Sequence, residues 1–356
     1  MKKLNVCVLF GGMSPEHKVS LRSAESVLSN MNPEKYNIIP IGISQEGDWT
    51  LYAGTDYSAI PAGTWVNHPD NRRAVISPLR GQGILIFEGD AVVRQWVDVV
   101  FPVLHGENGE DGTMQGLLQL AGIPFVGPHV AASSVSMDKT LTKLVADAAG
   151  IRQADWIGAT ALEIKNHLDS VLQRIEDKFT YPVFIKPAGT GSSVGVSKAA
   201  DREAAEAALR HAASFDDKVL IEEFIDGKEI EVAVMGNHNP VASVCGEIDS
   251  GAEFYDYDAK YLTDTSVAYI PARISQETEE LVRETAVRMY TSMGCQGLSR
   301  VDFFVTYRDE EVVFNEINTL PGFTSISMYP KLFAASGVPY DRLIDTLIEL
   351  ALEACE

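Results

Sequence analysis

Carboxylate and amide side chains recur at alternate positions of two apolar runs in the segment RVDFFVTYRDEEVVFNEINTLPGFTSIS. Alternate residues of a strand share one face, so Arg300 lies beside Asp302 on the first run. If the loop that joins the runs has three residues, Asp302 falls opposite Glu316, and Arg300 falls opposite Asn318. A two-residue loop would pair Asp302 with Ile317 and separate the polar groups. The three-residue register predicts a cluster of oxygen ligands, which Mg²⁺ takes together with substrate phosphates.

The acidic residues of this hairpin could instead form an ordinary solvent-exposed face. Apolar side chains on both faces argue against this, because carboxylates in a sheet that is covered on both sides need partners. The segment TLPGFTSIS follows, and its small residues allow the backbone to approach a ligand closely and donate N–H groups. The expected apolar positions are Phe303, Val305, Val313 and Ile317 on the far face, and Phe304 and Phe314 beside the carboxylates.

Length and charge limit the class of protein. A chain of 356 residues is too long for one ordinary core and predicts two or three domains. The net charge of -21 argues against nucleic acid or an anionic membrane surface as a partner, because phosphate attracts a basic face. No apolar run approaches the roughly 20 residues of a membrane helix. Four widely separated cysteines and an opening segment without a cleavage pattern indicate a cytoplasmic protein with reduced thiols.

The first third of the chain alternates strand and helix patterns. Residues 4–43 predict a strand–helix–strand unit, and a further strand is expected at 97–104. Parallel α/β sheets bind ligands at the carboxyl ends of their strands, where GGMSPEH and LHGENGEDG would both lie. Glu16, His17 and His105 are therefore candidates for contacting a small polar substrate. For His105, a local hydrogen bond within the turn is an equally good interpretation.

Two loops in the second half have the composition of covers over a ligand. Residues 181–186 are strand-like, and the small-residue loop 188–195 precedes another strand, which predicts a hairpin flap. A P-loop and a dinucleotide fingerprint are both excluded by the spacing GTGSSVG. Lys186 before the loop favours phosphate covering over a merely flexible turn. The later segment EFYDYDAKYL has no period and is expected to be a functional loop, with Lys260 and Tyr261 as phosphate and substrate candidates.

The remaining segments give further expectations. A helix is expected over residues 137–150, a second hairpin over 219–235, and a long connection over 54–83. The second hairpin could present its backbone to an adenine edge or be an ordinary half-buried pair of strands. The inward face of the helix is expected to comprise Leu141, Leu144, Val145 and Ala148. Another amphipathic helix, over residues 275–294, is expected to bury Val282, Ala286, Met289, Tyr290 and Met293.

These motifs together carry a family resemblance. In order, GGMSPEHKVS, LHGENGEDGT, KPAGTGSSVG, EEFIDGKEIEVAV, YDAKYL, RVDFF and NEINTLPGFTSIS resemble the D-alanine–D-alanine ligases of the ATP-grasp superfamily. The resemblance runs nearly end to end. It implies an α/β protein, α+β in its ATP-binding half, with the ATP-grasp fold and an N-terminal parallel α/β domain. The implied domains are 1–130 for substrate, 131–215 as the small central domain, and 216–356 carrying the metal and phosphate site.

The implied reaction joins two D-alanines for peptidoglycan synthesis, with ATP cleaved to ADP and phosphate through an acylphosphate. The implied partners are D-alanine, ATP and two Mg²⁺ or Mn²⁺ ions, in a cytoplasmic homodimer. Another ATP-grasp carboxylate–amine ligase, such as a D-alanine–D-serine ligase, would share the nucleotide and metal residues. A dehydrogenase would need a dinucleotide fingerprint that the first strand does not supply. A catalytically idle ATP-binding module would not need the full polar cluster of the hairpin.

The resemblance also implies roles for individual nucleotide and metal residues. The metal ligands are Asp302, Glu316 and Asn318. The lysines that contact phosphate are Lys139, Lys186 and Lys260. The residues around the adenine and ribose are Glu222, Glu223, Ile225, Glu229 and Phe304. Many relatives carry a basic or amide residue where this chain has Glu223, but the implied contact there is made largely by the backbone.

Further residues are implied to act on the substrates. The donors to the tetrahedral oxyanion are Arg300 and the N–H group of Gly322. The first substrate's ammonium is held by Glu16, with Ser192 and Tyr261 completing its hydrogen bonds. The second substrate's carboxylate is received by Ser327 and the backbone of Met328. His105 lies near the substrates without a specified part. Relatives that form a D-lactate ester lack the tyrosine at position 261, so its presence favours an amine as the second nucleophile.

Overall fold

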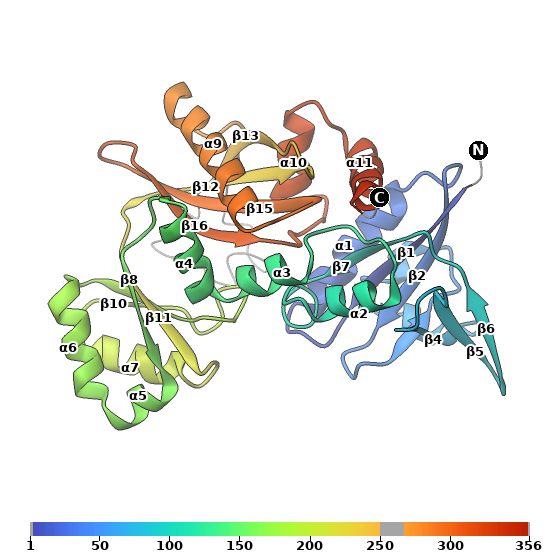
Figure 1. The fold of residues 1–356 in the computed structure, drawn as a ribbon, viewed down its shortest axis with the longest axis horizontal. Coiled ribbons are helices and arrows are strands. Elements are labelled where there is room, and N and C mark those ends of the chain that lie inside the picture. Colours follow the sequence, from blue (N-terminus) through green and yellow to red (C-terminus); the bar gives the residue numbers. More distant parts are fainter. Residues whose placement is uncertain (1–2, 250–266, 355–356) are drawn as a thin grey trace.

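Three β-sheets organise the chain in the computed structural model, which describes residues 3–249 and 267–354 (Figure 1). The first sheet has the strand order β6-β5-β4-β3-β2-β1-β7. Its strands are β1 (Leu4–Gly11), β2 (Tyr36–Ile43), β3 (Trp49–Leu51), β4 (Arg72–Ile76), β5 (Ile84–Glu88), β6 (Ala91–Gln95) and β7 (Val99–Leu104). Strands β7, β1 and β2 are parallel, whereas β3 to β6 join antiparallel. The expected parallel unit is confirmed as the three-stranded part of a mixed sheet.

The segment 54–83, expected to be a connection, contains regular structure. It includes β4 and the two short 3₁₀ helices η1 (Tyr57–Ala59) and η2 (Trp65–Asn67). Strand β4 begins with two exposed arginines and buries only Ala74 and Ile76 fully, so it shows too few apolar positions for a periodic signal. The segment expected to be a long connection or insertion therefore adds a strand to the first sheet.

Helices from both ends of the chain cover one face of the first sheet. Helix α1 (His17–Asn30) packs on β1, and α11 (Tyr340–Glu353) lies against α1 and β7. The shared core joins Val6 and Phe10 of the first strand to Leu343 and Leu347 of the last helix. This C-terminal helix thus ties the end of the chain to the N-terminal sheet. On the other side, β7 leads into α2 (Thr113–Ala121) through the loop HGENGEDG.

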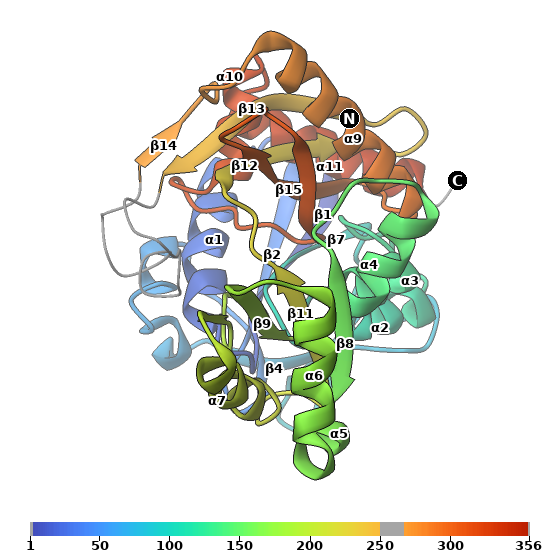
Figure 2. The same ribbon diagram turned by 90° about the vertical axis from the view of Figure 1, so that its left-hand side faces the viewer.

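The second sheet carries the glycine-rich flap. Its order is β10-β9-β11-β8, formed by β8 (Trp156–Thr160), β9 (Val183–Pro187), β10 (Ser197–Ala199) and β11 (Lys218–Glu223). Helices α5 (Ala161–Asn166), α6 (Leu168–Lys178) and α7 (Arg202–Ala212) belong to this part, which Figure 2 places nearest the viewer at the bottom. Strands β9 and β10 are antiparallel, so the predicted flap hairpin is confirmed.

The third sheet has the order β14-β13-β12-β15-β16. Its strands are β12 (Gly227–Met235), β13 (Val241–Asp249), β14 (Val267–Tyr269), β15 (Leu298–Thr306) and β16 (Val312–Asn318). Helix α9 (Gln276–Ser292) packs on it and buries the predicted face, from Val282 to Met293. The second expected hairpin is wrong, because β11 pairs with β8 and β9 while β12 pairs with β13 and β15. The Asp226-Gly227 pair marks a crossing between sheets rather than a tight turn.

Helices α3 (Val130–Met137), α4 (Lys139–Ala148) and α10 (Met328–Ala335) complete the described elements near the cavity. Helix α4 was expected over 137–150, but its inward face is not the predicted one. Leu141 is 39% exposed and Leu144 is 53% exposed, whereas Thr142, Lys143 and Ala146 are buried. The buried face differs because Lys143 is paired with a buried carboxylate, that of Glu222. A lysine with such a partner can be buried at a position where the periodicity predicts an exposed residue.

Candidate functional site

The hairpin β15–β16 reaches the predicted register by a different route. Arg300 pairs with Asn318, and Asp302 pairs with Glu316, as the three-residue loop predicted. The turn, however, spans residues 307–310, since the Thr306 N–H donates to the Glu311 carbonyl at 3.1 Å. A bulge then adds one residue between the pairs at Asp302 and Phe303. The bulge restores the pairing that the longer turn alone would have shifted by one residue.

The same bulge changes which apolar residues share a face with the carboxylates. Phe314 was expected beside them, but it lies on the far face, edge-on to Phe303 with ring centroids 6.0 Å apart. Val313, expected on the far face, instead pairs with Phe304. Phe304 itself lines the cavity, as predicted. The two wrong assignments have one cause, because an inserted residue reverses the alternation on the turn side of the bulge.

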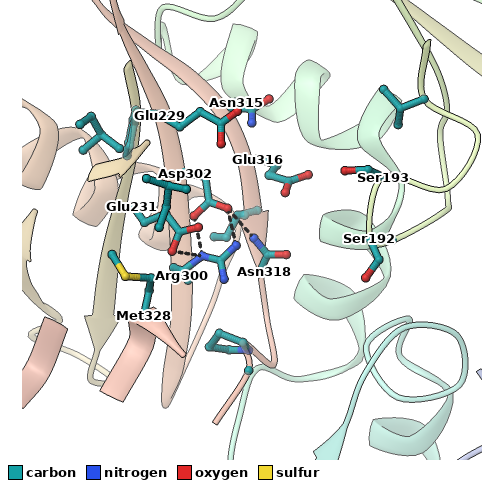
Figure 3. Close-up of a pocket in the computed structure, with 18 of the residues that line it drawn as sticks. Ser192, Ser193, Glu229, Glu231, Arg300, Asp302, Asn315, Glu316, Asn318 and Met328 are labelled. Carbon is teal, nitrogen blue, oxygen red and sulfur yellow. Dashed lines mark hydrogen bonds and ion pairs between the residues drawn. The ribbon is translucent and has the colours of Figure 1, made fainter. Parts of the chain in front are cut away.

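Arg300 lies between two carboxylates on neighbouring strands (Figure 3). Its Nε and Nη2 donate to Asp302 at 2.7 and 2.6 Å, and its Nε lies 3.2 Å from Glu231 Oε2. Burial alone would lower the pKa of Arg300, but the charges of Asp302 and Glu231 raise it well above its usual value. Arg300 is therefore a fixed cation at the cavity wall. Glu231 was missed in the sequence, although β12 places it directly opposite Asp302.

The donor set of the hairpin fits a hard cation. The Asn318 Nδ2 donates to Asp302 Oδ2 at 2.9 Å. The amide oxygen of Asn318 therefore faces away from Asp302. Asp302 and Glu316 supply carboxylate oxygens on the same face, and Glu316 points into the space in front of Ser193 in Figure 3. Within residues 3–249 and 267–354, no three His, Cys, Asp or Glu side chains group as a metal site. The set at the hairpin consists of two carboxylates and the amide of Asn318. Oxygen donors of this kind suit Mg²⁺ or Mn²⁺.

One cavity of about 1510 Å³ receives side chains from the second and third sheets and from α1 and the loop that follows β7. The candidate His17 does not line this cavity, and its Nδ1 instead lies 2.7 Å from the Gly12 carbonyl. Every other predicted site residue within the described ranges lines the cavity. They are Glu16, His105, Lys139, Lys186, Ser192, Glu222, Glu223, Ile225, Glu229, Arg300, Asp302, Phe304, Glu316, Asn318, Gly322, Ser327 and Met328. The remaining two, Lys260 and Tyr261, fall outside the described residues. The structure therefore brings together side chains that are up to about 300 positions apart in the sequence.

Glu16 meets the flap across the cavity. It occupies the N-terminal end of α1, and Ser192 Oγ donates to its Oε1. Gly106, at a φ of +70°, runs along the other side of the same carboxylate, where a Cβ would lie 2.3 Å from Glu16 Oε2. A larger residue at position 106 would displace the carboxylate, and the positive φ also favours glycine there. The carboxylate is thus confined between two loops.

His105 and two residues that the sequence did not single out hold the loop TLPGF. His105 Nδ1 lies 3.0 Å from the Leu320 carbonyl, and Glu110 Oε1 accepts the Leu320 N–H at 3.2 Å. Ser23 Oγ accepts the Phe323 N–H and lies 3.2 Å from His105 Nε2. Residues 320–323 are therefore fixed at both ends by α1 and the loop that follows β7. This part of the structure orients the N–H group of Gly322, which lies between them.

Burial and nearby charge change the pKa of two of these groups. Desolvation and the charge of Glu16 raise the pKa of Glu110 to about 8, despite the Gly106 N–H that it accepts at 2.7 Å. Desolvation lowers the pKa of His105, so its imidazole is neutral near pH 7. A neutral imidazole is consistent with its role as a hydrogen-bonding partner of two loops. The only sequence signal for Glu110 was its place in a loop beyond a strand end.

A row of charged groups, from α4, β9 and β11, lines another part of the cavity. Lys186 Nζ contacts Glu222, and Lys143 Nζ contacts the other oxygen of the same carboxylate. Burial would raise the pKa of Glu222, but the two lysines lower it to about 2. Lys139 Nζ donates to the Thr190 carbonyl at 2.7 Å, which joins α4 to the flap. Lys143 was not predicted, although it follows Lys139 by one helical turn.

The carboxylate of Glu223 faces away from this row. It accepts the Asp155 N–H at 2.9 Å and lies 3.4 Å from the Arg152 guanidinium. Its backbone, at the end of β11, remains at the cavity. This arrangement agrees with an interaction through the backbone at this position, as the sequence suggested.

Helix α10 begins at the far side of the hairpin. Ser327 precedes its first residue, Met328, and the Ser327 Oγ accepts the Thr324 N–H at 3.0 Å. A Cβ at Gly322 would lie 2.9 Å from this hydroxyl, so Gly322 and Ser327 pack closely within the segment between β16 and α10. The first N–H groups of a helix attract a carboxylate. The arrangement can receive an anionic group beside Arg300.

Solved structures share this fold over nearly the whole chain. The D-Ala:D-Ser ligase VanG from Enterococcus faecalis is 39% identical, with a TM-score of 0.89 over 98% of this chain and 100% of that one. The D-alanine-D-alanine ligase from Coxiella burnetii is 35% identical, with a TM-score of 0.85 over 99% of this chain and 96% of that one. Fold and cavity together define an ATP-grasp enzyme.

Sequence comparisons specify the family. The model of the D-ala D-ala ligase N-terminus matches residues 5–128, and that of the C-terminus matches residues 145–349. D-alanine–D-alanine ligases from Acetivibrio thermocellus and Clostridium acetobutylicum are each 49% identical, over 99% of this chain and 96% and 98% of their own lengths. The chain belongs to the D-alanine–D-alanine ligase family.

Proposed function

We propose that this chain joins two molecules of D-alanine to D-alanyl-D-alanine and converts ATP to ADP and phosphate. The observation that carries the proposal is the single cavity in which the hairpin carboxylates, Arg300, Gly322 and Glu16 come together. This set provides a place for phosphate, for a developing oxyanion and for an ammonium group. The family membership given above supports the choice of D-alanine, and the product would serve peptidoglycan synthesis.

The reaction has two bond-forming steps. A carboxylate oxygen of the first D-alanine attacks the γ-phosphorus of ATP, and the bond to ADP breaks as the new O–P bond forms. The amine of the second D-alanine then attacks the carbonyl carbon of this acylphosphate and releases a proton to solvent. The C–O bond to phosphate breaks, and the amide remains. Both steps require neutralisation of charge and an aligned approach.

The side chains divide this work. Glu16 would hold the ammonium of the first D-alanine, since its carboxylate is confined by Ser192 and Gly106. Arg300 and the Gly322 N–H would donate to the oxyanion of the tetrahedral intermediate, for which a preorganised donor is worth about 3–4 kcal/mol. The second D-alanine's carboxylate would bind at Ser327 and the start of α10. The flap would exclude water, which would otherwise hydrolyse the acylphosphate.

Asp302, Glu316 and Asn318 would hold two Mg²⁺ or Mn²⁺ ions. Bound there with ATP, the ions would neutralise charge on the phosphates. The Nδ2–H donated by Asn318 to Asp302 keeps the amide oxygen turned toward a cation. Lys139 and Lys186 would contact the phosphates, while Phe304, Ile225 and Glu229 would surround the base and ribose.

The organisation of the chain is part of the proposal. The first sheet would form the substrate domain 1–130, and the third sheet would lie in the domain 216–356. The second sheet would form the central domain, but its strand β11 (Lys218–Glu223) extends that domain beyond the expected boundary at residue 215. The protein would act as a cytoplasmic homodimer. No helix within the described residues is long and apolar enough to cross a membrane. Sedimentation of the purified protein at micromolar concentration would test the dimer.

Release of ADP that depends on D-alanine tests the function. Purified protein with ATP and Mg²⁺ should form ADP and dipeptide with D-alanine, and it should form neither with L-alanine. D-lactate alone should not replace D-alanine. A D-serine requirement alongside D-alanine would instead favour the activity named for the VanG relative. Absence of ADP release with every amino acid would overturn the proposal.

A further inference from the structure

Helix α4 turns a lysine into the interior at the phosphate end of the cavity. The side chain of Lys143 is 2% exposed, and its Nζ lies against Oε1 of Glu222. Oε2 of Glu222 lies against Nζ of Lys186, whose side chain is 13% exposed. The backbone of the α4 turn is fixed, because Gln153 Nε2 donates to the Lys143 carbonyl at 2.8 Å. Two lysines and one glutamate thus form a row that runs from the core to the cavity.

The charge of this row depends on its buried end. Glu222 is flanked by two ammonium groups, so the row carries one net positive charge. Without Lys143, the Glu222 carboxylate would neutralise Lys186 alone, and the row would carry none. A carboxylate that loses one of two buried partners also becomes costly to keep in place. The remaining charged group facing Lys143 from its own helix is Asp147, which interacts with it more weakly.

We propose that Lys143 is a positioning residue for the nucleotide, which holds Glu222 and leaves the positive charge of Lys186 available to the phosphates of ATP. The proposal rests on the proposed function, because it takes Lys186 as a phosphate-contacting lysine. Lys143 acts through Glu222, so it is a positioning residue rather than a catalytic one. Its removal should affect the binding of nucleotide much more than that of D-alanine.

The first experiment replaces the ammonium with an apolar side chain of similar length. Lys143→Met in the full-length protein should raise the Kd for ADP, measured by calorimetry, at least about tenfold. The KM for ATP should rise in parallel, while the KM for D-alanine stays within twofold. Lys218→Met is the matched control, because Lys218 also links β11 to α4, through Asp138, but is half-exposed. That variant should bind ADP like the wild type.

A second variant pair separates charge from packing. In a Glu222→Gln background Lys186 has no anion beside it, so adding Lys143→Met should change the ADP Kd by less than about threefold. The double variant removes a cation and an anion together, so it avoids the unbalanced buried charge of Lys143→Met alone. Wild-type ADP affinity in Lys143→Met would overturn the proposal, and so would an equal tenfold loss in both backgrounds. ADP binding is measured without D-alanine, so failure of the ligase function would appear separately, as absent D-alanine-dependent ADP release.

Discussion

Gly106→Ala tests whether the confined position of Glu16 governs substrate binding. The added methyl group would lie 2.3 Å from Glu16 Oε2, whereas ordinary contacts begin at 3.4 Å. The carboxylate must therefore retreat by about 1 Å, and a displacement of that size costs up to about 100-fold in rate. We expect kcat/KM for D-alanine to fall by about 10- to 100-fold, mainly through KM. The KM for ATP should change by less than twofold, since the atoms nearest to a Cβ at Gly106 belong to Glu16 and Ser14 and not to the lysine row.

The control for backbone strain is Gly63→Ala. Gly63 has a φ of +71°, nearly that of Gly106, but a Cβ there meets no atom within 4 Å. Both variants should lose about 1–2 kcal/mol of folding free energy, the usual cost of a left-handed conformation for alanine. Only Gly106→Ala should change D-alanine kinetics in a steady-state assay of ADP release. Equal kinetics in the two variants would refute the assignment of the first substrate's ammonium to Glu16.

Three further changes have defined outcomes. Glu110 has a pKa of about 8 when folded against 4.5 ordinarily, so the stability it contributes is full below about pH 4.5 and lost as pH rises through 8. The unfolding free energy of wild type minus Glu110→Gln should fall over that range in denaturant titrations, and parallel profiles would contradict this. Asp302→Asn should weaken Mn²⁺ binding with ATP at least about tenfold by electron paramagnetic resonance; an unchanged affinity would move the metal elsewhere. Ser192→Ala should raise the ADP released per dipeptide by loosening the flap, and an unchanged ratio would count against that closure.

Periodicity predicted some helices correctly and misplaced one face. Helix α9 buries Val282, Ala286 and Tyr290 as expected, because its buried face is the apolar face that the periodicity shows. Helix α4 exposes Leu144 and buries Lys143, since the partner of that lysine, Glu222, comes from a different sheet. A pattern within one segment contains no information on a partner that is about 80 positions away.

The hairpin shows how a correct pairing can follow from an incorrect detail. The alignment of Asp302 with Glu316 was predicted from a three-residue loop, and the structure obtains it from a longer turn and a bulge. The pairing of Asp302 with Glu316 is the same in both cases. The faces of Val313 and Phe314, by contrast, depend on the position of the extra residue in the bulge. The family motifs thus located the polar residues better than the strand pattern located the apolar ones.

Residues that act through other residues were the ones that sequence reasoning missed. Glu231, Glu110 and Lys143 contact Arg300, the backbone of Leu320 and Glu222, respectively. Each contact joins segments that are far apart in the sequence, so it becomes visible only when the chain is folded. The predicted residues, by contrast, belong to motifs whose order along the chain was itself specific.

Transfer of an oxygen isotope tests the central claim most directly. If the carboxylate of the first D-alanine attacks ATP, then D-alanine labelled with ¹⁸O in both carboxyl oxygens must pass one labelled oxygen to phosphate for each dipeptide formed. Mass spectrometry of the phosphate and the dipeptide measures this transfer. We predict one ¹⁸O atom in each released phosphate. Phosphate without ¹⁸O, formed together with dipeptide, would contradict the acylphosphate route and the roles derived from it.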